Sequence, residues 1–172
     1  MPGAILQVNI SPGGLPKHPI RGGLVTSLGL EGDGHAHPQF HGGPDKAILL
    51  ISIETIEELK TRGYPLFPGA MGENLTTTGI DVRALRIGDR LRAGGAELEI
   101  TSPRGPCTQL DVYGDSLKHE IYDKLVKARN PKTPRWGMSG FYAGVISPGE
   151  VRAGDILTVV AQSAAKLAAG SA

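Results

Sequence analysis

The sequence predicts a mainly β fold of the β-rich α+β class: one barrel-like domain with a few short helices. The 172 residues include 25 glycines and 13 prolines, both above average usage, so turns must be frequent. The hydrophobic fraction of 40% is sufficient for a core, and the length suits a single domain. We expect this domain to span residues 1–160, followed by a flexible C-terminal tail of small residues over 161–172.

Short apolar runs between turn residues mark the expected strands. Residues 96–101 alternate, which places Leu98 and Ile100 toward a core. Residues 47–53 form a continuous apolar run, typical of a strand that is buried on both faces. The other expected strands are residues 5–10, 24–28, 75–78, 141–147 and 156–160.

Two helices are expected between these strands. Ser52 is suited to cap a helix over residues 53–62, and Gly63 is suited to end it. A second helix is expected over residues 115–127, where apolar residues recur four apart on one face. These apolar residues are Leu117, Ile121 and Leu125.

Charge and composition exclude several classes of partner. The 18 Lys and Arg residues nearly balance 17 Asp and Glu residues, so no broad basic face for nucleic acid is implied. The longest apolar run, residues 47–51, is far too short to cross a membrane. Because Cys107 is the single cysteine, no internal disulfide can form. We therefore expect a cytoplasmic protein that acts on a small molecule, with no nucleic acid or membrane partner.

Cys107 ends a stiff loop that directly follows the alternating run. Pro103 and Pro106 fix the backbone at two points, and Gly105 leaves one permissive joint. Arg104 lies three residues from Cys107, where its charge would favour a thiolate. A thiolate suits a soft metal or sulfur transfer, whereas a small buried apolar role is the alternative for this residue.

Glycine, histidine and carboxylate residues are densest over residues 29–46. Glycines such as Gly42 and Gly43 allow a backbone nest that binds an anion. The histidines and nearby carboxylates could instead bind zinc or iron for hydrolysis, or form a solvated polar loop. The residues concerned are His35, His37, His41, Asp33 and Asp45.

Two further stretches combine polar or aromatic residues with glycine. Glu73 and Asn74 bring a carboxylate and an amide to the start of the short strand over 75–78, as a site or as part of a turn. Trp136, the only tryptophan, stands beside a glycine-framed strand, where we expect it to pack in the core.

Taken in order, these stretches resemble the MOSC domain, which is named for the C-terminal domain of molybdenum cofactor sulfurase. The resemblance extends over about residues 20–160. The matching segments are residues 29–33, 41–47, 72–75, 87–89, 106–107, 142–146, 149–151 and 154–155.

The resemblance implies a β-barrel-like fold and a molybdenum–pterin cofactor. Cys107 maps to the family's signature cysteine, the proposed thiolate ligand of molybdenum or a sulfur carrier. Arg104 and Lys46, with Gly42 and Gly43, are suited by charge and backbone to hold the cofactor's phosphate. The residues that match motif positions around the same depression are His41, Asp45, Glu73 and Asn74.

Some family members reduce N-hydroxylated compounds with electrons from a separate flavin or haem protein, and this is the activity we expect. The cofactor can be lost when such proteins are purified. The family is also associated with pyridoxal phosphate, but the sequence shows no aminotransferase-like domain and no lysine context typical of that cofactor.

Three alternatives remain open at this stage. Cys107 could carry a persulfide received from a cysteine desulfurase. The chain could be a zinc or iron hydrolase whose metal is held by His35, His37 and His41. The chain could also be a binding module for a small ligand without catalysis.

Overall fold

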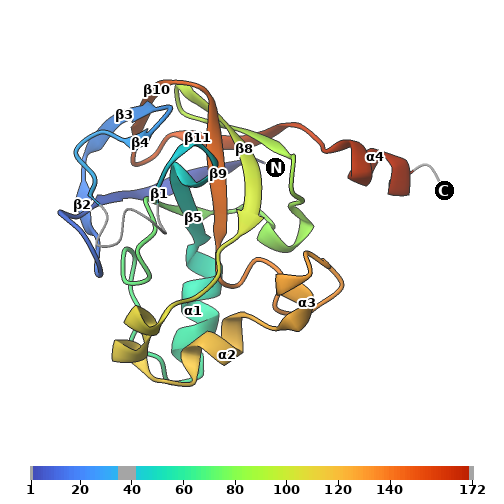
Figure 1. The fold of residues 1–172 in the computed structure, drawn as a ribbon. Helices are drawn as coiled ribbons and strands as arrows, with labels where there is room; N and C mark the ends of the chain where they lie inside the picture. The colour runs from blue at the N-terminus through green and yellow to red at the C-terminus, as the bar shows by residue number, and fades with distance from the viewer. Residues whose placement is uncertain (1, 35–41, 171–172) are drawn as a thin grey trace.

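A closed β-barrel of seven strands forms the body of the molecule (Figure 1). The computed structural model describes residues 2–34 and 42–170. The barrel strands follow the order β11-β7-β8-β9-β5-β6-β1, and pairing of β11 with β1 closes the ring. Their bounds are β1 (Gly3–Ile10), β5 (Ile48–Ser52), β6 (Leu75–Thr78), β7 (Arg90–Ala93), β8 (Ala96–Pro103), β9 (Phe141–Ser147) and β11 (Ile156–Ala161). The predicted mainly β class is confirmed.

Two smaller features extend the barrel. Strand β2 (His18–Ile20) pairs with β1 at the edge of the large sheet. Strands β3 (Gly22–Thr26), β4 (Gly29–Leu30) and β10 (Gly149–Arg152) form a separate small sheet, at the upper left in Figure 1.

Strand β5 separates two apolar cores, which explains its continuous apolar sequence. Ile48 and Leu50 belong to the core inside the barrel. Leu49 and Ile51 belong to a second core outside it, which the helices cover. All five residues of β5 are buried, so the expected strand with two buried faces is confirmed.

Helix α1 (Ile53–Thr61) connects β5 to β6, and these two strands pair in parallel. Its N-terminus forms as predicted, because the Ser52 hydroxyl accepts a hydrogen bond from the Thr55 N–H at 3.2 Å. Gly63, with φ of 97°, follows the end of the helix. The short 3₁₀ helices are η1 (Pro44–Lys46), η2 (Val82–Ala84) and η3 (Thr108–Tyr113).

The single helix predicted over residues 115–127 is wrong, because the segment divides into two. Helix α2 (Leu117–Ile121) ends at the extended residue Tyr122, and α3 (Lys124–Lys127) begins after Asp123. The Asp123 carboxylate accepts the N–H of Val126 at 2.8 Å and so caps a new helix. Leu125 therefore leaves the apolar face and is 46% exposed.

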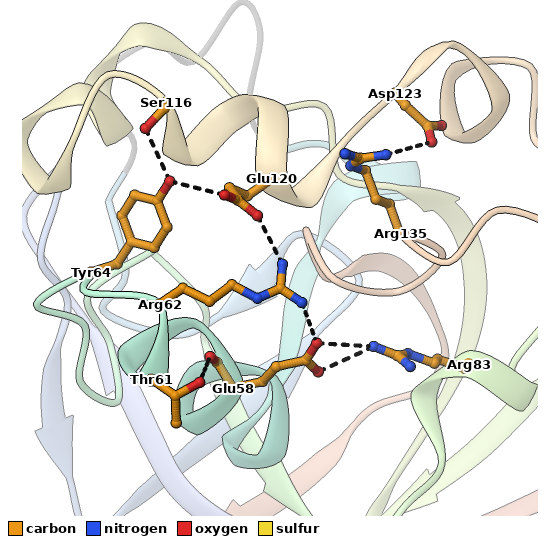
Figure 2. Close-up of polar contacts among 9 residues, drawn as sticks. All are labelled: Glu58, Thr61, Arg62, Tyr64, Arg83, Ser116, Glu120, Asp123 and Arg135. Carbon is orange, nitrogen blue, oxygen red and sulfur yellow. Dashed lines mark hydrogen bonds and ion pairs between the residues drawn. The ribbon is translucent and has the colours of Figure 1, made fainter.

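Ion pairs attach α1 to its neighbours (Figure 2). Arg62 lies 2.7 Å from Glu58 on α1 and 2.8 Å from Glu120 on α2. Arg83 on η2 also contacts Glu58, at 3.1 Å. These contacts hold together the helical layer that lies below the barrel in Figure 1.

The remaining predictions concern Trp136 and the C-terminal segment. Trp136 is buried in the barrel core and packs edge-on against Phe141, as expected. Residues 161–172 contain α4 (Ala164–Gly170), which extends away from the barrel (Figure 1). No helix in the described part of the chain has both the length and the apolar character to span a bilayer.

Candidate functional site

A pocket with about 530 Å³ of empty space, part of it open to solvent, lies where several loops and strand ends meet. Five of the residues predicted from the sequence contribute to its lining: Gly42, Lys46, Asn74, Arg104 and Cys107. These residues come from segments that are far apart in the sequence, and the fold brings them together around one pocket.

Cys107 lies at the junction between the loop after β8 and helix η3. It is half-buried, and its backbone oxygen accepts a hydrogen bond from the Leu110 N–H at 3.2 Å. The Arg104 N–H donates to the Gly140 oxygen at 2.9 Å, which fastens the loop to the segment before β9. The proline-framed loop therefore holds the only thiol of the chain at the wall of the pocket.

Arg104 is a buried cation with incomplete hydrogen bonding. Its residue is 3% exposed, and Nη2 donates to the backbone oxygen of Met71 at 3.0 Å. Nε and Nη1 are buried and have no hydrogen-bond partner among the residues that the structure describes. Because an unsatisfied buried charge is unfavourable, this guanidinium is suited to an anionic ligand that accepts from both atoms.

Lys46 and Tyr142 form the side of the pocket near η1. The Lys46 ammonium lies 5.4 Å from the centre of the Tyr142 ring. Burial raises the pKa of the Tyr142 phenol, the Arg104 charge opposes this, and a Cys107 thiolate would add to it. The phenol is thus neutral near pH 7 and can donate a hydrogen bond.

A buried ion pair holds another lining residue, Lys17, in place. Nζ of Lys17 lies 2.6 and 2.7 Å from the two oxygens of Asp33, and both side chains are less than a tenth exposed. Asp33 also accepts from Nδ2 of Asn74 at 2.8 Å, while Oδ1 of Asn74 accepts from the Leu49 N–H at 3.1 Å. This network fastens the segment with Ser11, whose N–H donates to Asp33, against the start of β6.

Glu73 lies behind the pocket and does not line it. Its residue is completely buried, and Oε1 accepts from the Gly69 N–H at 2.6 Å and from the Thr76 hydroxyl at 2.9 Å. Within residues 2–34 and 42–170, Oε2 has no hydrogen-bond partner. Burial raises the pKa of the Glu73 carboxyl, while these hydrogen bonds and the Arg104 charge act in the opposite direction.

The other predicted residues are placed differently. Gly43 and Asp45 lie at η1 beside the pocket, and the Asp45 residue is exposed. His35, His37 and His41 lie outside the described residues. Within residues 2–34 and 42–170, no group of three or more His, Cys, Asp or Glu side chains could hold a metal ion. Asp33, considered above as a metal ligand, is instead paired with Lys17.

Sequence reasoning missed three polar residues of the pocket lining: Lys17, Gln109 and Tyr142. Gln109 follows Cys107 closely, and this proximity was the one local signal available. Lys17 gave no such signal, because its partner Asp33 is sixteen residues away in the sequence.

Comparison with known proteins identifies the family of this chain. A family model of the MOSC domain matches residues 37–158, which is more than half of the chain. The chain belongs to the MOSC domain family. The matched range contains Cys107 and Arg104, together with the motif residues Glu73 and Asn74. This family is associated with the molybdenum cofactor.

Several relatives align over most of this MOSC chain. It is 33% identical over 156 residues to protein YiiM of Escherichia coli (strain K12) and 32% identical over 153 residues to YflK of Bacillus subtilis (strain 168). These alignments cover 88% and 87% of the chain but 65% and 64% of the relatives, so the chain spans somewhat less than two thirds of their length. A protein named reductase from Gibberella moniliformis (strain M3125 / FGSC 7600) is 28% identical over 179 residues, covering 92% of the chain and 29% of that protein.

Solved structures confirm the barrel as a MOSC fold. The crystal structure of YiiM from Geobacillus stearothermophilus superimposes with a TM-score of 0.70 at 26% identity, covering 93% of this chain and 76% of that one. YiiM from Escherichia coli gives a TM-score of 0.67 at 25% identity, with 95% and 71% covered.

Proposed function

We propose that this MOSC protein binds a molybdenum–pterin cofactor in the pocket and reduces small N-hydroxylated compounds. Electrons would come from a separate flavin or haem protein. The observation that carries the proposal is that one thiol, Cys107, and one incompletely bonded guanidinium, Arg104, line the same pocket. The similarity to a protein named reductase supports the redox assignment.

The residues present fit the two ends of such a cofactor. The Cys107 thiolate is a soft ligand of the kind that molybdenum accepts. Arg104 offers Nε and Nη1 to a phosphate, and Lys46 adds a second positive charge to the pocket lining. When bound, the cofactor would supply the redox chemistry that removes oxygen from the substrate.

The protein's own part is to bind, orient and protect the reacting groups. The neutral Tyr142 phenol keeps its proton and can donate a hydrogen bond beside Cys107. Leu15, Leu49 and Met71 give the pocket an apolar side, which favours a small, largely apolar substrate. The ion pair with Asp33 holds Lys17 in the pocket lining.

The test is elemental analysis of protein made in a host supplied with molybdate. We expect near-stoichiometric molybdenum in the wild type and in the neighbouring control variant Thr108→Ala, whose side chain is exposed. Cys107→Ser should lose the metal and also the reduction of an N-hydroxylated test compound by a chemically reduced donor.

Two other results would contradict the proposal. Absence of molybdenum together with a mass gain of one sulfur atom on Cys107 would identify a sulfur carrier. Zinc or iron that is retained in Cys107→Ser but lost when His41 is replaced would identify a histidine-based metal site.

A further inference from the structure

Two buried groups of opposite charge lie beside the pocket, and both have unused hydrogen-bonding atoms. Glu73 has one free carboxylate oxygen, Oε2, and Arg104 has two free donors, Nε and Nη1. Buried polar atoms are normally paired, so three such atoms in one place require an explanation. Among the described residues, only two other side chains contain such an atom, Arg135 and Ser139.

Both groups are anchored on the same short turn, residues 69–73. The Gly69 N–H donates to Oε1 of Glu73, and the Met71 oxygen accepts from Nη2 of Arg104. Arg104 lines the pocket, whereas Glu73 does not. An anion in the pocket would therefore contact the guanidinium, with the carboxylate in the layer behind.

We propose that the Arg104 site takes up an oxyanion together with a proton, and that the proton binds to the Glu73 carboxylate. This inference rests on the proposed function only in so far as the cofactor's phosphate is the natural oxyanion. When the oxyanion neutralises Arg104, part of what stabilises ionised Glu73 is lost. The carboxylate then takes a proton from solvent, and no bond other than this O–H bond is formed.

The surroundings of Glu73 favour this exchange. The charged or titratable groups that face it in the described structure are Arg104, after β8, and Tyr113, on η3. Tyr113 donates its hydroxyl hydrogen to the Ala70 oxygen at 2.7 Å, and burial and the Glu73 charge raise the pKa of its phenol. Tyr113 is therefore neutral near pH 7, and Arg104 is the group whose neutralisation shifts Glu73.

The test is sulfate binding by calorimetry in buffers of different ionisation enthalpy. Sulfate remains a dianion between about pH 5 and 9, so any proton taken up must bind to the protein. Between the pKa of Glu73 in the free protein and its higher pKa in the sulfate-bound protein, we expect the wild type to take up a proton and to bind sulfate up to about tenfold more tightly for each unit by which pH falls. Arg104→Met should abolish the binding.

Glu73→Gln is the decisive variant. It should bind sulfate without the Glu73-linked proton, with a weaker pH dependence, and more tightly than the wild type at high pH. Glu57→Gln, which removes an exposed carboxylate on α1, should behave as the wild type. If Glu73→Gln does not fold, infrared difference spectra of the wild type labelled with isotopic glutamate should show a protonated carboxyl band when sulfate is added.

Several results would overturn the inference: no sulfate binding, binding that survives Arg104→Met, or proton uptake that is unchanged in Glu73→Gln. Absence of the protonated carboxyl band would do the same. The outcome is separable from the proposed function, because Cys107→Ser should still bind sulfate with its proton. If the protein holds no molybdenum but still couples sulfate binding to proton uptake, the proposed function is wrong and the inference stands.

Discussion

Asp33 holds two pocket-lining residues, Lys17 and Asn74, in place. It accepts from Lys17, Asn74 and the Ser11 N–H, so three segments meet at one carboxylate. A buried pair contributes little net stability when intact, but removing one partner leaves the other charge uncompensated. The role of Asp33 is thus to position these two lining residues, while Cys107 and Arg104 would contact the ligand.

Asp33→Ala should lower the free energy of unfolding by about 3–5 kcal/mol, because the Lys17 ammonium stays buried without its partner. Urea denaturation would measure this loss. Adding Lys17→Met to Asp33→Ala should recover a large part of it, because the unpaired charge is then removed. A loss below about 1 kcal/mol in the single variant would show that Lys17 reaches water without the pair.

At the scale of elements, α1 is held by its apolar face and by the ion pairs of Arg62 (Figure 2). Arg62→Met should lower the free energy of unfolding by less than about 1 kcal/mol, because the pairs with Glu58 and Glu120 are more than a third exposed and screened by solvent. Thermal unfolding would measure the change, with Lys60→Met as the control for an ion pair within α1. A larger loss, reduced by salt in the wild type, would mean that the network acts as a unit.

Elements with a strong local pattern were predictable. The alternating run became β8, and the Ser52 cap and Gly63 stop bounded α1 within one residue. The helix over 115–127 was not predictable from periodicity, because Asp123 caps a new helix and is itself held by Thr133, ten residues later. Strands β2 and β10 each contain only one β-branched apolar residue, Ile20 and Val151, so no apolar pattern marks them.

The residues of the pocket also divide into those that the sequence predicts and those that only the fold reveals. Cys107, Arg104 and Lys46 could be nominated from the local sequence and its family resemblance, and all three line the pocket. Lys17 could not, since it lies outside the matching segments and its partner Asp33 is sixteen residues away. Glu73 was nominated as a lining residue, yet the turn over 69–73 turns its carboxyl inward, which only the fold reveals.

At the scale of the whole molecule, Glu73 should make stability depend on pH. Burial raises its pKa in the folded protein above the ordinary value that it has in the unfolded chain. Between those two pKa values, the folded state holds a proton that the unfolded state has released. Stability therefore falls as pH rises through this window, with a slope of at most about 1.4 kcal/mol per pH unit from this group.

Glu73→Gln removes that proton and should remove this part of the slope. Urea denaturation from about pH 4 upward should give little pH-linked difference between variant and wild type at the acidic end, because Glu73 is then protonated in both states of the wild type. The advantage of the variant should increase with pH and become constant above the raised pKa. Glu57→Gln, with its exposed side chain, should follow the wild-type curve. Parallel curves for Glu73→Gln and wild type would mean that Glu73 ionises as readily in the folded protein as in water, because Arg104 compensates its burial completely.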